Sequence, residues 1–310
     1  MRIIGPTEID RALAYGPLIE RLREAFRSGG EVPVRHHHTV PTPGAADATL
    51  LLMPAWQTGR HIGVKIVTVF PDNGGRNLPA VMGSYLLLDG QTGTPLAQID
   101  GPALTARRTA AASALAASYL ARADAARLLM VGTGALAPHL IPAHAATRPI
   151  REVQVWGRDP AKAQWLAERL NRPDFSVSAT ADLEESVRWA DIVSCATLAR
   201  QPLVKGAWLQ SGVHLDLVGG FTPDMREADD DAVRRARIYV DTRAGATVEA
   251  GDIVQPLRNG VIADADIRGD LFDLTRGAAM GRGGADEITL FKSVGTALED
   301  LAAAQLAVES

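Results

Sequence analysis

The clearest structural signal in this chain is the stretch Leu128-Leu129-Met130-Val131-Gly132-Thr133-Gly134-Ala135-Leu136-Ala137. Its first four residues predict a short buried strand, and the residues that follow it can form a helix. Between them, Gly132 permits a tight turn, Gly134 lets a pyrophosphate approach the backbone, and Ala137 allows close packing of helix on strand. The free N–H groups of that helix attract phosphates. Residues 132–137 are therefore candidate dinucleotide-binding residues; the alternative is a glycine-rich turn that binds no ligand.

Strand and helix patterns alternate around this turn, from about residue 126 to residue 282. Alternation of this kind is typical of an α/β domain with a parallel sheet that is covered by helices on both faces. Together with the glycine-rich turn it predicts a Rossmann-type dinucleotide-binding domain. The expected strands are residues 128–131, 153–156, 192–196, 214–218 and 237–240, and the expected helices are residues 161–170 and 183–190.

The residues before this region give mixed signals. Residues 18–26 predict an amphipathic helix, and turn signals at 72–75 and 89–90 separate apolar strands. The alanine-rich residues 104–121 predict a closely packed helix. The expected strands are residues 50–53, 62–70 and 84–88. The tail, residues 287–308, is rich in alanine and leucine and predicts a further helix.

Composition excludes several classes of protein. The 310 residues are 46% hydrophobic and 22% charged, with a net charge of −4 and no basic block of the kind that binds nucleic acid. The single cysteine, Cys195, rules out an internal disulfide. No apolar run approaches the length of a membrane span, and the first ten residues lack the core of a signal peptide. We therefore expect a cytoplasmic protein with no nucleic-acid or membrane partner.

The end of the second strand bears on the choice of cofactor. An acid at that position would bind the ribose 2′-hydroxyl of NAD, but Gly157 occupies the place and Arg158 follows it. A guanidinium can pair with a 2′-phosphate, so the pattern favours NADPH, with NADH possible. Two alternatives stay open: Arg158 could be a solvated loop residue, and a shifted register would place Asp159 at the acidic position.

Charged residues in apolar surroundings are candidates for a substrate site. Lys65 lies inside the apolar run 62–70, where a charge is rare unless it is paired, functional or on an exposed edge strand. Arg107 and Arg108 lie about 100° apart on one helix, so only one can point into a given cleft, and both could be surface residues. The run His36-His37-His38 alternates faces in an extended segment, so no metal site is expected.

The chain as a whole resembles the ornithine cyclodeaminase/μ-crystallin family. The resemblance implies a Rossmann domain at residues 116–289, and a substrate and dimerisation domain at residues 1–115 that a C-terminal helix at 290–310 completes. It also implies a homodimer. It rests on Pro33-Val34-Arg35, Gly63-Val64-Lys65, Leu104-Thr105-Ala106-Arg107-Arg108-Thr109-Ala110-Ala111, the turn at 132–137, Val218-Gly219-Gly220-Phe221-Thr222-Pro223 and Glu287-Ile288-Thr289-Leu290-Phe291-Lys292-Ser293-Val294-Gly295.

Family members bind a substrate carboxylate with an arginine, a lysine and an arginine, which match Arg35, Lys65 and Arg108. The resemblance also implies that Ser293 and Gly295 lie near the nicotinamide of the cofactor. It favours Lys65 as a catalytic residue that binds the carboxylate or supplies a proton. These roles are carried over by analogy of position.

One departure from the cyclodeaminase pattern bears on function. The cyclodeaminases carry a catalytic Asp where this chain has Phe221, and Asp224 lies three residues further on. The pattern here is similar to that of the ketimine reductases. We therefore expect NADPH-dependent reduction of a small cyclic imino acid, Δ1-pyrroline-2-carboxylate or Δ1-piperideine-2-carboxylate, to proline or pipecolate. The alternatives are ornithine cyclodeamination, an amino-acid dehydrogenase and a non-catalytic μ-crystallin-like binding protein.

Overall fold

Two sheets organise the chain. The computed structural model describes residues 1–310, which form two compact units: residues 1–109 with residues 296–310, and residues 110–295. We refer to these as the first unit and the second unit. The helix α3 (Gly101–Leu120) begins in the first unit and ends in the second. No helix is long and apolar enough to span a membrane.

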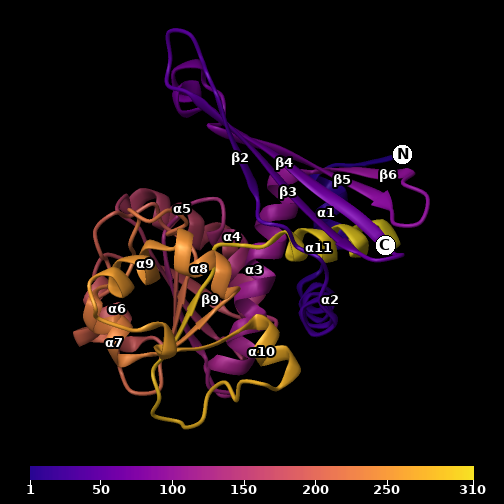
Figure 1. Cartoon of the computed structure of the whole chain (residues 1–310). Helices are drawn as coiled ribbons and strands as arrows, with labels where there is room; N and C mark the ends of the chain where they lie inside the picture. The colour runs from indigo at the N-terminus through magenta and orange to yellow at the C-terminus, as the bar shows by residue number, and fades with distance from the viewer. The chain divides into compact units, whose positions relative to one another are not determined.

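The first unit is built on a six-stranded sheet of order β1-β6-β5-β4-β3-β2 (Figure 1). All neighbouring strands are antiparallel except β1 and β6. The helix α11 (Ala297–Glu309) packs against the three central strands and against α2 (Tyr15–Ser28). The remaining elements are β1 (Arg2–Ile4), α1 (Pro6–Ala12), β2 (His36–Val40), β3 (Ala48–Gln57), β4 (His61–Val69), η1 (Pro71–Arg76), β5 (Val81–Asp89) and β6 (Pro95–Asp100).

The second unit is built on an eight-stranded, fully parallel sheet of order β13-β12-β14-β11-β10-β7-β8-β9. Its strands are β7 (Arg127–Val131), β8 (Glu152–Trp156), β9 (Ser176–Thr180), β10 (Ile192–Cys195), β11 (His214–Leu217), β12 (Arg237–Val240), β13 (Ile267–Asp270) and β14 (Thr289–Lys292). The chain runs outward through β8 and β9, then crosses to the other side of β7 to form β10. This reversal of strand order creates the crevice at which open α/β sheets bind ligands.

Helices surround this parallel sheet (Figure 1). They are α4 (Ala137–Ala145), α5 (Pro160–Leu170), α6 (Leu183–Trp189), α7 (Asp230–Arg235), α8 (Arg243–Glu249), α9 (Gly251–Arg258) and α10 (Leu271–Arg276), with short 3-10 turns η2 (Gly206–Trp208) and η3 (Asp264–Asp266). The central strands are buried along their whole length, so their side chains form the core of the unit. The expected α/β fold with a parallel sheet is confirmed.

The tail differs from the expected helix. Residues 287–308 were predicted to be helical throughout, but residues 289–292 form β14, in the middle of the parallel sheet, and the helix α11 begins only at Ala297. Periodicity cannot separate an apolar run of four residues from one turn of a buried helix. The prediction was therefore wrong for the first part of the tail and right for the part rich in alanine.

Candidate functional site

A cavity of the second unit lies where the strand order reverses. It has a volume of about 560 Å³, and the loops that follow β7, β8 and β10 line it. Its lining includes Gly132, Thr133 and Gly134 of the turn, and Arg158. A crevice at the carboxyl ends of parallel strands is the usual dinucleotide site of this architecture.

The two glycines of the turn have different structural requirements. Gly132 has a φ of +120°, and a Cβ there would lie 2.5 Å from the carbonyl oxygen of Ala196, so no other residue fits. At Gly134 a Cβ would meet nothing within 4 Å. The protein itself therefore leaves the space beside Gly134 open, as close approach of a ligand to the backbone requires.

The loop after β8 places a cation at the cavity. Arg158 is exposed, lines the cavity and forms no hydrogen bond or ion pair within the chain. The Asp159 carboxylate caps α5, because it accepts hydrogen bonds from the backbone N–H groups of Ala161 (3.0 Å) and Lys162 (3.4 Å). Although Asp159 also lines the cavity, its carboxylate is engaged as a helix cap and not as the last residue of the strand.

Gly157 carries a steric constraint that disfavours an acid at its position. A Cβ there would lie 2.7 Å from Cγ2 of Thr133, so any side chain would have to displace the branched side chain of Thr133. The cations Lys162 and Arg200 also line the cavity. The wall near residue 157 therefore offers positive charge and no carboxylate at the strand end, as a 2′-phosphate would require.

The other expected cofactor residues do not line this cavity. Ala135 and Leu136 precede α4, and Ala137 is buried as its first residue. Ser293 and Gly295 follow β14 and are buried. The Asp241 carboxylate accepts hydrogen bonds from the N–H groups of Val294 (2.7 Å) and Gly295 (2.6 Å), which fixes the course of this loop.

A second group of charged residues lies within the first unit, around Lys65. Lys65 is the middle residue of β4, an internal strand, and is only 4% exposed, so it is not an edge-strand lysine. Its Nζ lies 2.8 Å from Oδ2 of Asp300. Burial, reinforced by Arg108 and Arg35 and opposed by Asp300, lowers the pKa of Lys65 to about 8. A lysine with such a pKa can donate a proton near neutrality.

Arg108 joins the same group from α3. Its Nε donates to Oδ1 of Asp300 (2.9 Å), and its Nη1 donates to Oε2 of Glu299 (2.5 Å). Both carboxylates lie in α11 and are fully buried. Burial favours the protonated form of Asp300, but Arg108 and Lys65 outweigh it, so the pKa of Asp300 lies below its ordinary value. Asp300 therefore links the two cations as a shared counter-ion.

Tyr85 completes the surroundings of Lys65. It lies opposite Lys65 in the pairing of β4 with β5 and is fully buried. Burial, with a further contribution from Asp300, raises the pKa of its hydroxyl far above its usual value. A Cβ at Gly63 would lie 1.8 Å from the Tyr85 hydroxyl, so Gly63 makes the room that this ring occupies.

The structure separates the two neighbouring arginines of α3. Arg108 is buried, whereas Arg107 pairs with Asp10 (2.7 Å) and lies over the Tyr15 ring at 4.9 Å. The view that both are surface arginines was therefore wrong. Arg35, half-buried just before β2, is close enough to influence the pKa of Lys65.

Sequence reasoning missed the acidic members of this group. Glu299 and Asp300 lie side by side in an otherwise apolar helix, which was a usable signal, because charges inside such a helix must be paired. With Arg35, Lys65 and Arg108 the group holds three cations and two buried carboxylates.

The loop after β11 carries the departure noted in the sequence. Phe221 is 48% exposed, and a phenyl ring can neither accept a proton nor bind an ammonium group as a carboxylate does. Asp224 accepts a hydrogen bond from the Thr222 hydroxyl and lies 3.3 Å from Nε of Arg200. No group of three or more His, Cys, Asp or Glu side chains is placed to hold a metal ion.

Known proteins with related sequences include reductases of cyclic imino acids. Δ1-Pyrroline-2-carboxylate reductase of Paracoccus denitrificans is 42% identical over 297 residues, which cover 93% of this chain and 93% of the relative. The ketimine reductase mu-crystallin of Rattus norvegicus is 32% identical over 95% of this chain and 91% of its own.

Solved structures share the whole architecture. Thermococcus litoralis Δ1-pyrroline-2-carboxylate reductase in complex with NADH and L-proline has a TM-score of 0.92 and 34% identity, covering 100% of this chain and 97% of its own. An archaeal alanine dehydrogenase dimer with bound NAD has a TM-score of 0.90 and 29% identity, covering 100% of this chain and 95% of its own. The profile of the ornithine cyclodeaminase/mu-crystallin family matches residues 6–310. The chain belongs to the ornithine cyclodeaminase/mu-crystallin family.

Proposed function

We propose that this protein is an NAD(P)H-dependent oxidoreductase that reduces the C=N bond of a cyclic imino acid. The observation that carries the proposal is the buried Lys65–Arg108–Asp300 group, which supplies both a carboxylate anchor and a proton donor of lowered pKa. The substrates that fit are Δ1-pyrroline-2-carboxylate and Δ1-piperideine-2-carboxylate, and the products are L-proline and L-pipecolate. The relatives that act on such imines support this assignment.

The first unit's charged residues have distinct tasks in this reaction. Arg108 and Arg35 bind the substrate carboxylate, for which a planar guanidinium is well suited. Asp300 and Glu299 hold Arg108 in one orientation, and Asp300 also holds the ammonium group of Lys65. Lys65 either adds to the carboxylate anchor or transfers its proton to the imine nitrogen.

When bound, NAD(P)H would supply the hydride that C2 of the imine accepts. Addition of that hydride at carbon and of one proton at nitrogen converts the C=N bond to CH–NH, with no other reactant. Gly132, Gly134 and the N–H groups at the start of α4 would hold the pyrophosphate, and Arg158 would hold the adenosine 2′-phosphate. Ser293 and Gly295 would lie near the nicotinamide.

Ornithine cyclodeamination is the main alternative reaction. It requires a group that handles the substrate amine, and Phe221 stands where the cyclodeaminases have that Asp. Cofactor stoichiometry separates the two, because cyclodeamination consumes no NAD(P)H and imine reduction consumes one per product. We expect NADPH oxidation to equal proline formation with the five-membered imine, and no proline from ornithine with NAD⁺. The proposal fails if ornithine yields proline and ammonia without net cofactor change.

Arg158→Ala tests the choice of cofactor. Loss of a charge-assisted contact to a 2′-phosphate should weaken NADPH binding by roughly 1.5–3 kcal/mol, which is about ten- to a hundred-fold. We expect KM for NADPH to rise by that factor and KM for NADH to stay nearly constant, as measured by initial rates with each cofactor. Arg172→Ala, which removes a distant arginine stacked on Phe175, is the matched control. Equal losses with both cofactors in Arg158→Ala would refute a contact with the phosphate.

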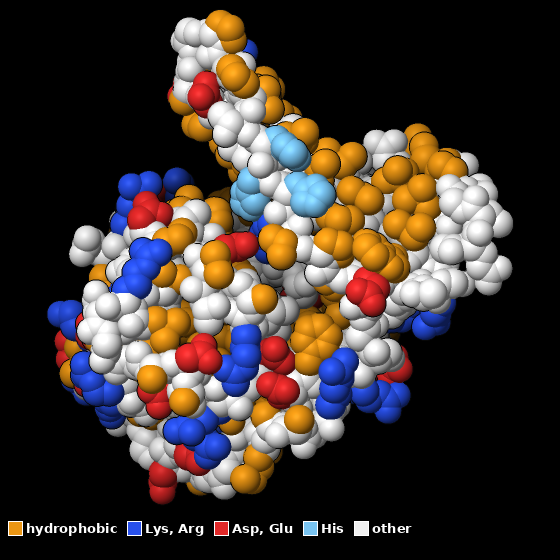
Figure 2. Space-filling view, viewed as in Figure 1, with side chains coloured by type: hydrophobic (Ala, Val, Ile, Leu, Met, Phe, Trp, Pro, Cys, Tyr) orange, Lys and Arg blue, Asp and Glu red, His pale blue; other side chains and the backbone are white.

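We infer that the active protein is a homodimer built on the first unit's sheet. The face of this sheet that carries Lys65 lies under α11, but the opposite face carries apolar side chains that are only partly buried. Hydrophobic side chains gather over these strands in Figure 2. Members of this face are Leu52, Pro54, Val64, Ile66 and Leu86. We expect a sedimentation mass of two chains and a shift to one chain in Leu86→Glu; a wild-type monomer would contradict the inference.

A further inference from the structure

Glu227 is a fully buried carboxylate that has no role in the proposed imine reduction. Its Oε1 accepts hydrogen bonds from the backbone N–H (2.7 Å) and the hydroxyl (2.8 Å) of Thr197. Its Oε2 accepts one from the backbone N–H of Gly219 (2.7 Å). Three N–H and O–H donors reach this carboxylate, an arrangement that suits its ionised form.

The two loops that Glu227 joins lie at the carboxyl ends of neighbouring strands. Thr197 follows β10 and lines the dinucleotide cavity, and Gly219 follows β11. A Cβ at Gly219 would lie 2.0 Å from the carbonyl oxygen of Thr197, so the loops touch through their backbones. The Thr197 hydroxyl also accepts a hydrogen bond from the N–H of Ala199 (3.3 Å), a further residue of the cavity wall. The position of this wall therefore depends on Glu227.

Other charged and titratable groups surround Glu227. The Asp252 carboxylate, from α9, accepts hydrogen bonds from the N–H of Glu227 (2.8 Å) and of Ala228 (3.1 Å), and lies 3.6 Å from Nζ of Lys292. Lys292, from β14, and Cys195, from β10, also interact electrostatically with Glu227. Burial, opposed by Lys292 and reinforced by Asp252, raises the pKa of Glu227 to about 7.

We propose that Glu227 is a positioning residue for the cofactor: in its ionised form it fixes the loops after β10 and β11 and thereby shapes the dinucleotide cavity. The proposal rests on the dinucleotide-binding part of the proposed function. Protonation turns one acceptor oxygen into a donor that faces N–H groups, so it loosens the cavity wall. Cofactor affinity should therefore be highest above pH 7 and should fall as pH decreases through that value.

The experiment is a fluorescence titration of the purified protein with NADH from pH 6 to pH 8.5. NADH is the probe because it lacks the 2′-phosphate, which would itself titrate in this range. We expect wild-type Kd at pH 6 to exceed that at pH 8 by about ten-fold, because below pH 7 the binding of each NADH releases about one proton from Glu227. Glu227→Gln should bind about ten-fold more weakly at pH 8, because its amide cannot accept all three hydrogen bonds, and its Kd should not change with pH.

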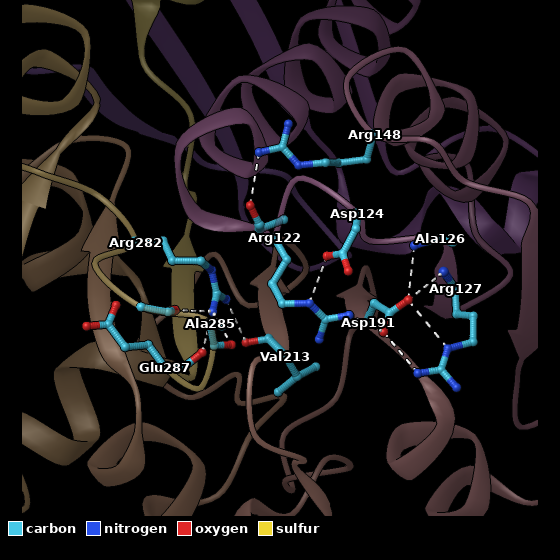
Figure 3. Close-up of polar contacts among 12 residues, drawn as sticks. Arg122, Asp124, Ala126, Arg127, Arg148, Asp191, Val213, Arg282, Ala285 and Glu287 are labelled. Atoms are coloured by element: carbon cyan, nitrogen blue, oxygen red, sulfur yellow. Dashed lines mark hydrogen bonds and ion pairs between the residues drawn. The ribbon is translucent and has the colours of Figure 1, made fainter.

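A matched control separates positioning from fold stability. Asp191 is a buried carboxylate that accepts hydrogen bonds from the N–H groups of Ala126 and Arg127 at the amino end of β7, whereas Thr197 and Gly219 follow the carboxyl ends of their strands (Figure 3). Asp191→Asn should lower the melting temperature and leave Kd for NADH unchanged. If Glu227→Gln does not fold, Thr197→Val takes its place; it removes one donor to Glu227 and should weaken NADH binding several-fold.

Three results would overturn the proposal. The first is that Glu227→Gln binds NADH as tightly as the wild type and differs only in a lower melting temperature. The second is a pH dependence that persists unchanged in this variant, because another group would then titrate. The third, if only Thr197→Val folds, is unchanged affinity in that variant. Failure of the wild type to bind any dinucleotide would instead refute the proposed function.

Discussion

Lys65→Met is expected to lower kcat/KM for the imino acid by at least about a hundred-fold, the low end for loss of a general acid. Methionine keeps the length of the side chain and removes the ammonium group. Asp300 retains Arg108 as a partner, so the variant should fold. Steady-state rates at saturating cofactor measure the effect. Lys205→Met, which removes an exposed lysine stacked on Trp208, is the matched control and should keep wild-type rates.

The pH profile decides which role Lys65 has. Its pKa of about 8 means that the ammonium form dominates below pH 8 and is lost as pH rises. If Lys65 is the proton donor, the wild-type rate should fall above about pH 8. In Lys65→Met, kcat should be lower and this decrease at high pH should be absent. If it is only an anchor, KM should rise while kcat changes little, because ground state and transition state share the carboxylate contact. A high-pH limb that survives in Lys65→Met would show that the proton comes from elsewhere.

Arg108→Ala is expected to produce the largest loss of stability in the first unit. It leaves the carboxylates of Glu299 and Asp300 buried, and Glu299 loses its ion pair with the guanidinium. Removal of one partner of a buried ion pair typically costs about 3–5 kcal/mol. Denaturant unfolding measures the free energy of unfolding. The fraction of the variant that remains folded should bind cofactor normally but reduce the imine slowly.

Its neighbour Arg107 supplies the control for Arg108→Ala. Arg107→Ala removes an ion pair with an exposed Asp10 and a contact with the Tyr15 ring, which together should cost about 0–2 kcal/mol. Glu299→Gln in the Arg108→Ala background should recover part of the lost stability, since it removes one buried anion. If Arg108→Ala unfolds with the same free energy as Arg107→Ala, the buried ion-pair group does not stabilise the unit.

The parts of the fold that depend on local pattern were predictable. The strand 128–131, the turn after it and the alanine-rich helix each carry their signal in neighbouring residues, and all three occur as expected. The short strand β14 has no such signal, because its place in the sheet depends on pairing with β11 and β12. Its residues were therefore assigned to the following helix.

The site was only half predictable for a related reason. Lys65 and Arg108 stand out as charges in apolar segments, but their partners Glu299 and Asp300 lie about two hundred residues away in sequence. Spacing in the sequence cannot predict these contacts, because only the tertiary packing of α11 brings Glu299 and Asp300 close to β4 and α3. Glu227 lies four residues after the stretch 218–223 that carries part of the family resemblance, yet its role emerges only from the two loops that it joins.

Hydride transfer from the nicotinamide to C2 of a cyclic imino acid is the step that defines the proposed reaction. The direct test supplies Δ1-pyrroline-2-carboxylate and NADPH deuterated at both C4 positions, then analyses the product by mass spectrometry and NMR. We predict one deuterium at C2 of L-proline for each NADPH oxidised, and the same result for pipecolate if the six-membered imine is accepted. Proline without deuterium at C2, or NADPH oxidation only with pyruvate and ammonia, would contradict the account.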